Sequence, residues 1–77
     1  MSTMEILYDN IDAERARNHL TLAQFAESIG MSDRCYRQHR EHLKPLKIDK
    51  LVKIADVFNC SIDYLTGRTD KIRMEDK

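Results

Sequence analysis

The side chains best suited to chemistry crowd into one short stretch, MSDRCYRQHREHLKP, which spans residues 31–45. It holds one thiol and two imidazoles, Cys35, His39 and His42, at spacings that place them near one side of a helix. Thiolate and imidazole are zinc ligands, and a cysteine beside a histidine is also a pair used in nucleophilic catalysis. The same stretch is rich in Lys and Arg, which bind the phosphates and base edges of nucleic acids.

The surrounding sequence disfavours both a metal site and a catalytic site. No second pair of ligands stands at the spacing of a zinc finger, and the other cysteine, Cys60, is isolated. No third residue is placed to orient an imidazole as a base, and no glycine-rich loop offers donors to a phosphate or an oxyanion. We therefore predict a protein that is not an enzyme and holds no metal or cofactor, with Cys35 and His39 packed against the fold.

Charge favours a nucleic acid as the partner of this stretch. The 77 residues suit one small domain, and 13 Lys and Arg balance 13 Asp and Glu. Residues 34–50 nevertheless hold six Lys or Arg against two acidic residues, and the local field, not the total charge, attracts phosphate. No apolar run approaches a membrane span, and the first ten residues lack a basic leader and a signal core. We expect a cytoplasmic protein, associated with the nucleoid and not with a membrane.

Apolar spacing and capping signals predict two short helices joined by a tight turn. Residues Leu22 and Phe25 begin an apolar helical face that continues to Ile29. Its start is marked by Thr21 and Gln24, a T-x-x-Q capping box, and Gly30 ends it. A second helix follows at once over residues 33–41, with Ser32 as its cap and with Tyr36 and His39 turned inward.

Three further helices complete the prediction, and no segment reads as a strand. A first helix carries Leu7 and Ile11 and ends near His19. The fourth has an apolar face made of Ile48, Leu51, Val52, Ala55 and Phe58. The fifth is a turn or two that begins after Ser61. Residues 1–68 are predicted to form the domain, followed by a charged tail over residues 69–77.

These residues resemble the Cro and phage-repressor type helix-turn-helix family, also called the xenobiotic-response-element family. The resemblance covers about residues 11–68. It rests on the T-x-x-x-x-A-x-x-x-G-x-S frame of residues 21–32 and on the segment LVKIADVFNCSIDYLTGR. It implies a compact five-helix bundle of the lambda-repressor-like type that binds double-stranded DNA, usually as a homodimer on a palindromic operator. The helix after the turn would lie in the major groove.

The same resemblance implies roles for individual residues. The positions that read bases are Asp33, Arg34, Arg37 and Gln38, while those that hold the DNA backbone are Thr21, Ser32, Lys44 and Lys47. Candidates for a dimer interface are Ile62, Tyr64 and Leu65, where the apolar side chains exceed what one narrow helical face can bury. Packing in the core of the same chain is the alternative for these residues. The implied function is a transcriptional regulator that acts as a repressor.

Three departures from the family pattern keep an alternative open. Leu22 replaces a glutamine that usually touches DNA, and the loop over residues 41–45 lacks the usual Asn-Gly. Arg40 replaces a glutamate that usually pairs with an arginine at the position of Arg15, so we expect Arg40 to swing outward or to pair with Glu14. The alternative is a degenerate helix-turn-helix module that binds another protein, as an antirepressor or dimerisation partner would.

Overall fold

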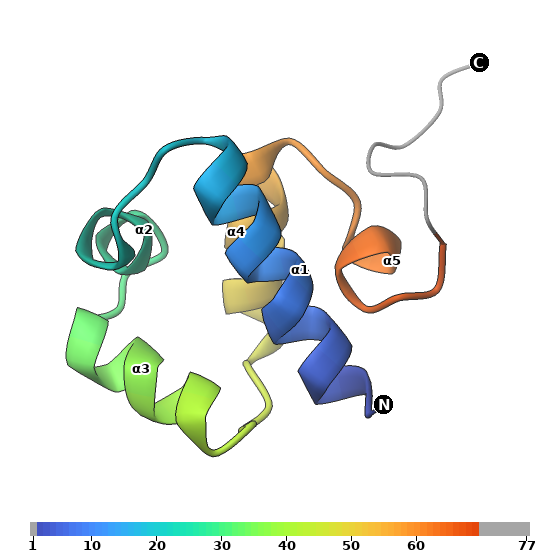
Figure 1. The fold of residues 1–77 in the computed structure, drawn as a ribbon, viewed down its shortest axis with the longest axis horizontal. Helices are drawn as coiled ribbons and strands as arrows, with labels where there is room; N and C mark the ends of the chain where they lie inside the picture. The colour runs from blue at the N-terminus through green and yellow to red at the C-terminus, as the bar shows by residue number, and fades with distance from the viewer. Residues whose placement is uncertain (1, 70–77) are drawn as a thin grey trace.

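The computed structural model describes residues 2–69 as five α-helices and their connections (Figure 1). In chain order the helices are α1 (Thr3–Arg17), α2 (Leu22–Ser28), α3 (Asp33–Glu41), α4 (Ile48–Phe58) and α5 (Ile62–Leu65). Every regular element in this range is helical, which confirms the prediction of an all-α, five-helix protein. No helix within residues 2–69 is long and apolar enough to cross a membrane. Residues 70–77 of the predicted charged tail lie outside the described residues.

Four of the helices begin at a hydroxyl side chain that accepts a hydrogen bond from the first helical turn. These residues are Ser2, Thr21, Ser32 and Ser61. Thr21 and Gln24 form the predicted capping box, and the caps at Ser32 and Ser61 are also confirmed. A second capping box, between Ser2 and Glu5, was not predicted and starts α1 at Thr3.

The turn between α2 and α3 closes with backbone hydrogen bonds of a Schellman motif. The Met31 N–H donates to the Ala26 carbonyl at 2.9 Å, and the Gly30 N–H donates to the Glu27 carbonyl at 3.0 Å. Gly30 has φ +78°, a left-handed conformation that glycine adopts without the steric cost of a Cβ atom. The predicted termination of α2 at this glycine is therefore confirmed, and α3 starts three residues later.

Aromatic rings form the centre of the core and join helices that are distant in the sequence. The rings of Phe25 and Phe58 stack at 5.3 Å, and Tyr36 meets Phe25 edge-on at 5.1 Å. Tyr8 on α1 meets Tyr36 in turn at 6.0 Å. One cluster of buried side chains includes members of all five helices. The predicted inward orientation of Tyr36 is confirmed, since its side chain is fully buried.

The predicted apolar face of α4 is partly wrong. Ile48 and Val52 are 68% and 44% exposed, whereas Ile54, which was not included in that face, is fully buried. The buried residues Ile54, Ala55 and Phe58 all belong to the C-terminal half of α4, which crosses behind α1 (Figure 1). Leu51 in the N-terminal half also packs against the core, so the inward side of α4 carries Leu51, Ile54 and Phe58. Ile48 and Val52 lie on a different side of the helix, in solvent.

The helices lie in three groups. The crossed pair α1 and α4 occupies the centre, α2 and α3 lie together on one side, and α5 lies on the other (Figure 1). The α2–turn–α3 unit therefore presents one whole side of the protein to solvent. Any molecule that approaches α3 from outside meets this side first.

Candidate nucleic-acid interface

The outer face of α3 carries the side chains predicted to read bases. Arg34 and Gln38 are exposed and lie one helical turn apart, on the side of α3 opposite to the buried Tyr36. Arg37 donates to Asp33 at 3.0 Å, and this pair also lies in solvent. Within residues 2–69, Arg34 and Gln38 form no side-chain hydrogen bond or ion pair, while Arg37 is held along its own helix by Asp33.

Two hydroxyl groups cap the starts of α2 and α3. Thr21 Oγ1 accepts from the Gln24 N–H at 3.1 Å, and Ser32 Oγ accepts from the Cys35 N–H at 3.0 Å. A hydroxyl that accepts one such bond still has its own hydrogen to donate. Both exposed groups therefore keep a donor for a phosphate oxygen, as the predicted role in holding the DNA backbone requires.

The loop between α3 and α4 is pinned to α1. The Tyr8 hydroxyl donates to the Lys44 carbonyl at 2.5 Å, and the Lys44 N–H donates to the His39 carbonyl at 2.9 Å. Leu43 takes a left-handed conformation, φ +52°, at the end of α3. The side chains of Lys44 and Lys47 remain exposed on this fixed backbone. Both ammonium groups are thus carried by a positioned loop.

Arg40 has a partner that the sequence analysis did not identify. Its guanidinium donates to Asp12 Oδ2 from Nε at 3.1 Å and from Nη2 at 2.6 Å, and it lies 5.8 Å from the Tyr8 ring centre. The expectation that Arg40 swings outward or pairs with Glu14 is therefore wrong. Glu14 lies on another side of α1, where it pairs with Arg17 and accepts from the Tyr64 hydroxyl at 3.3 Å.

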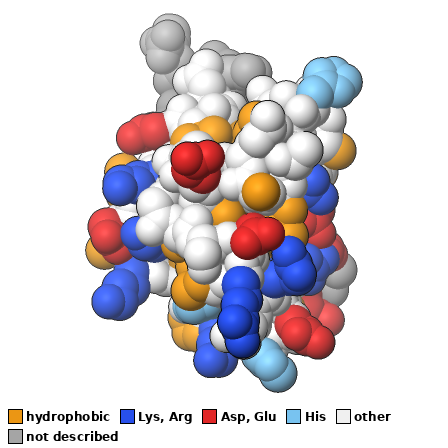
Figure 2. Space-filling view, turned by 90° about the vertical axis from the view of Figure 1, so that its left-hand side faces the viewer, with side chains coloured by type: hydrophobic (Ala, Val, Ile, Leu, Met, Phe, Trp, Pro, Cys, Tyr) orange, Lys and Arg blue, Asp and Glu red, His pale blue; other side chains and the backbone are white. Residues whose placement is uncertain are grey.

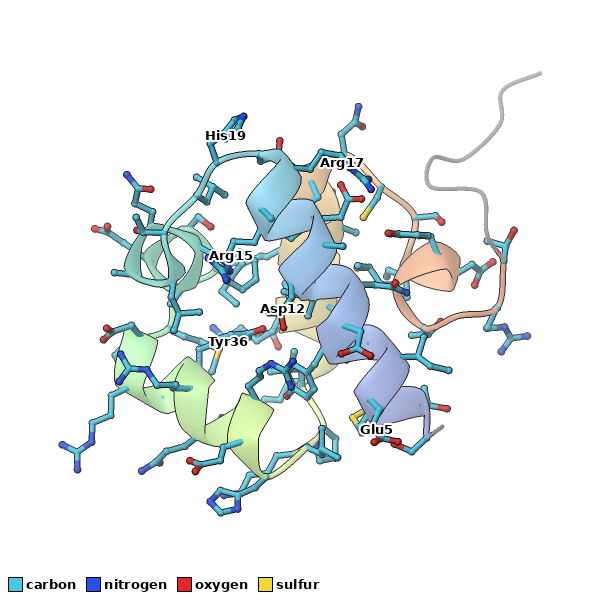
Figure 3. The ribbon with its side chains drawn as sticks, viewed as in Figure 1. Glu5, Asp12, Arg15, Arg17, His19 and Tyr36 are labelled. Carbon is cyan, nitrogen blue, oxygen red and sulfur yellow. The ribbon has the colours of Figure 1, made fainter. Side chains whose placement is uncertain are left out.

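Arg15 and Arg40 do not face each other as two unpaired cations, because Arg15 binds a backbone carbonyl. Its Nη1 donates to the Leu20 carbonyl at 3.0 Å. Figure 3 shows Asp12 and Arg15 both directed from α1 toward Tyr36, whereas Arg17 lies at the far end of the helix.

Within residues 2–69, Arg15 Nε and the Tyr36 hydroxyl are buried without a hydrogen-bond partner. Burial raises the pKa of the Tyr36 hydroxyl, so it stays protonated.

Lys50 and Lys53 were missed as members of this surface. Their ammonium nitrogens lie 3.3 Å and 3.7 Å from the point that a Cβ on Gly30 would occupy, so both reach the α2–α3 turn. With Lys47 they recur every three residues along α4, and that spacing is the signal that could have revealed them. A hollow of about 400 Å³ lies beside them, with Ser32, Cys35 and His39 of α3 on its wall.

The positive side chains gather around the α2–α3 side of the protein. Viewed onto this side, Lys and Arg cover the lower half and one edge of the surface, with Asp and Glu among them (Figure 2). The surface is therefore mixed in charge, with a positive excess around α3 and the start of α4. Such a local excess attracts phosphate although the whole chain has a formal net charge of zero.

Cys35 and His39 are near neighbours in a geometry unsuited to nucleophile activation. Cys35 Sγ lies 3.8 Å from His39 Nδ1, but Nδ1 also lies 2.9 Å from the Cys35 carbonyl oxygen. A carbonyl can only accept, so Nδ1 must carry a hydrogen and cannot take the thiol proton. Cys35 and His42 are exposed, so the prediction that Cys35 packs against the fold is wrong, whereas His39 is half-buried. Among residues 2–69, no group of three His, Cys, Asp or Glu side chains could hold a metal ion.

The predicted dimer residues differ in exposure. Ile62 and Tyr64 are half-buried, while Leu65 is fully buried in the core of its own chain. Ile62 also borders a shallow apolar hollow of about 360 Å³ that includes Val52 on α4. Exposed apolar surface at this end of α4 therefore continues into the start of α5.

Comparison with known proteins identifies a relative that matches most of this chain. The chain is similar to a helix-turn-helix regulator. That relative is named an uncharacterized HTH-type transcriptional regulator, YobD, of Bacillus subtilis (strain 168), and is 38% identical over 56 residues. The match covers 73% of this chain and 50% of the relative, so the chain spans about half the length of the curated relative it matches. No protein-family model matches the chain, and no solved structure matches it significantly.

The similarity and the α2–turn–α3 geometry together support a protein of the helix-turn-helix class. The narrower resemblance to the Cro and phage-repressor type stays a prediction. The base-reading and backbone-holding roles also stay predictions.

Proposed function

We propose that this chain is a sequence-specific, DNA-binding transcriptional regulator. The observation that carries the proposal is the orientation of α3, which buries Tyr36 and directs Arg34 and Gln38 to solvent directly after the Gly30 turn. A helix of this kind fits the major groove of B-DNA, where its exposed side chains reach base edges. The name of the relative, an HTH-type transcriptional regulator, supports the same function.

Each exposed side chain of α3 has a chemical match in the groove. Arginine bridges the two acceptors of guanine, and glutamine bridges the acceptor and donor of adenine. We assign these contacts to Arg34 and Gln38. Asp33 can accept from a cytosine amino group, or it can hold Arg37 toward a base or a phosphate through the 3.0 Å ion pair. This arrangement provides several distinct contacts over one helical turn of α3.

In this proposal, contacts to the DNA backbone accompany the base contacts of α3. The hydroxyls of Thr21 and Ser32 donate to phosphate oxygens, and Lys44 and Lys47 contribute positive charge from the pinned loop. Contacts to phosphate fix the register of the protein on the duplex without reading sequence. Because the whole chain is neutral, nonspecific binding should be weak and specificity should rest on the bases.

We further propose a homodimer on a palindromic operator. The exposed apolar surface of Val52 and Ile62 is the surface we assign to the second copy. Two-fold symmetry would place the two α3 helices in successive major grooves, about 34–36 Å apart. A dimer that occupies an operator excludes other proteins from it, so we propose the role of a repressor acting at the nucleoid.

The alternative function is a module that binds another protein and not DNA. Two observations favour it: Leu22 packs against the core where the family pattern has a polar residue, and Ile48 and Val52 expose apolar surface. A helix-turn-helix unit that lost its DNA contacts would keep the fold and use such a surface for a partner protein.

Selection from a pool of random duplexes separates the two functions. The protein is incubated with the pool at low and moderate salt, and bound duplexes are amplified and sequenced over several rounds. The DNA-binding function predicts enrichment of one sequence, and Arg34→Ala and Arg37→Ala should abolish or change that sequence. Salt-sensitive binding without enrichment, or no binding, would favour the protein-interaction module.

A further inference from the structure

Two ammonium groups of α4 converge on the turn between α2 and α3. The nitrogens of Lys50 and Lys53 lie 3.3 Å and 3.7 Å from the point that a Cβ on Gly30 would occupy, so they are also close to each other. At 3.3 Å such a Cβ would press on the Lys50 ammonium, so a side chain at this position would force that lysine to move. The glycine thus provides both the left-handed turn and the space for the lysines.

No carboxylate in the described part of the chain forms an ion pair with either lysine. The ion pairs within residues 2–69 involve Arg17, Arg37, Arg40 and Arg68, and none involves a lysine. Two like charges held near each other repel, and an anion between them would relieve that repulsion. The pair is therefore an unneutralised positive site next to α3.

A hollow connects these lysines to α3. Its volume is about 400 Å³, and it is lined by Lys47 and Lys50 and by the α3 cap Ser32 with Cys35 and His39 of α3. These α3 residues lie on the flank next to the outward Arg34 and Gln38. A duplex whose major groove holds α3 would therefore bring the bordering phosphates toward α4.

We propose that Lys50 and Lys53, continuing from Lys47, form a phosphate clamp on α4 that grips the DNA backbone beside the groove read by α3. This inference rests on the proposed DNA-binding function and extends it to residues outside α3 and the loop that follows. The clamp holds phosphate and reads no bases, so it acts equally on every sequence.

The test is the salt dependence of binding for Lys50→Gln with Lys53→Gln. Fluorescence anisotropy gives the affinity for a selected duplex and a random duplex over a series of salt concentrations. Each phosphate contact contributes about 0.9 to the slope of log affinity against log salt, so the double variant should lower the slope by about two. The loss of affinity should be the same on both duplexes. Thermal unfolding measured in parallel should remain close to that of the unmodified chain.

Arg68→Gln is the matched control, because it removes a positive charge after α5, on the opposite side of α1 and α4 from α2 and α3. It should leave the salt slope unchanged. If the double variant keeps the slope while its melting temperature falls, the lysines only stabilise the end of α2 and the clamp is wrong. If the unmodified protein binds neither duplex, the proposed function itself is wrong, and the clamp falls with it.

Discussion

Arg40 and Asp12 join the end of α3 to the middle of α1 through two hydrogen bonds to one oxygen. Both Nε and Nη2 of Arg40 donate to Asp12 Oδ2, at 3.1 Å and 2.6 Å. Asp9 adds a longer contact of 3.7 Å to the same guanidinium. Since Arg40 follows Gln38 by two residues, this bridge helps to orient the face of α3 that we propose to read bases. The polarity is the reverse of the family pattern, in which α1 carries the cation.

Removing the bridge should destabilise the fold. Because both side chains are 36% exposed, solvent screens the pair, and we expect Arg40→Met to lower the free energy of unfolding by about 1 kcal/mol. Chemical denaturation measures this change. Arg37→Met is the control, since its partner Asp33 lies on the same helix in solvent, and its effect should stay within about 0.5 kcal/mol. If Arg40→Met and Asp12→Asn prove additive when combined, the two residues do not interact.

Two tyrosines of the core should respond in opposite directions to loss of their hydroxyls. The Tyr36 hydroxyl is buried without a partner in residues 2–69, so Tyr36→Phe should leave stability unchanged or raise it by up to about 1 kcal/mol. The Tyr8 hydroxyl donates to the Lys44 carbonyl, so Tyr8→Phe should lower stability by about 1 kcal/mol. Thermal unfolding of both variants checks the contrast. A clear loss of stability in Tyr36→Phe would mean that its hydroxyl is hydrogen-bonded after all.

Stability should fall in alkaline solution as tyrosine ionises in the unfolded chain. Burial raises the pKa of Tyr8 from 10.0 to about 12, although the Arg40 charge opposes the shift. Between pH 10.0 and about 12, Tyr8 loses its hydroxyl proton in the unfolded chain but keeps it in the folded chain. The free energy of unfolding therefore decreases as pH rises. Denaturation at several pH values in this range measures the slope. Tyr8→Phe should show a shallower slope, and an identical slope would contradict the assignment to Tyr8.

Local signals in the sequence sufficed for the starts of α2, α3 and α5 and for the tight turn. Thr21, Ser32 and Ser61 cap helices through contacts within three residues, and Gly30 ends α2 through its own backbone conformation. These features depend on neighbours in the chain, so the sequence alone revealed them. The orientation of Tyr36 followed from the spacing of α3 and from the family resemblance.

Features that depend on distant segments were harder to predict. The buried face of α4 depends on which side of the helix is turned to the core, and the apolar spacing alone led to Ile48 and Val52 instead of Ile54. The partner of Arg40 depends on which residue of α1 faces the end of α3. In the folded chain this residue is Asp12 and not Glu14. The spacing of Lys47, Lys50 and Lys53 is visible in the sequence, but the approach of Lys50 and Lys53 to Gly30 exists only in the folded chain.

The dimer proposal predicts a concentration-dependent mass that one charged substitution abolishes. Val52 is 44% exposed beside Ile62, so Val52→Asp should disrupt a dimer formed there without disturbing the core. Sedimentation equilibrium over a range of concentrations measures the association. Val57→Asp is the control, since this residue has a similar exposure of 36% but does not line the hollow at Val52. A monomer at every concentration, with and without duplex, would contradict the proposed homodimer.

The proposed reading of bases by α3 is tested by comparing Arg34→Ala with Lys47→Ala on selected and random duplexes. Fluorescence anisotropy gives the four affinities at fixed salt. Arg34→Ala should cost about 1 to 3 kcal/mol on the selected duplex and much less on the random one, whereas Lys47→Ala should weaken both equally. An equal loss on the two duplexes for Arg34→Ala would show that Arg34 contacts only the backbone, and the assigned reading role would be wrong.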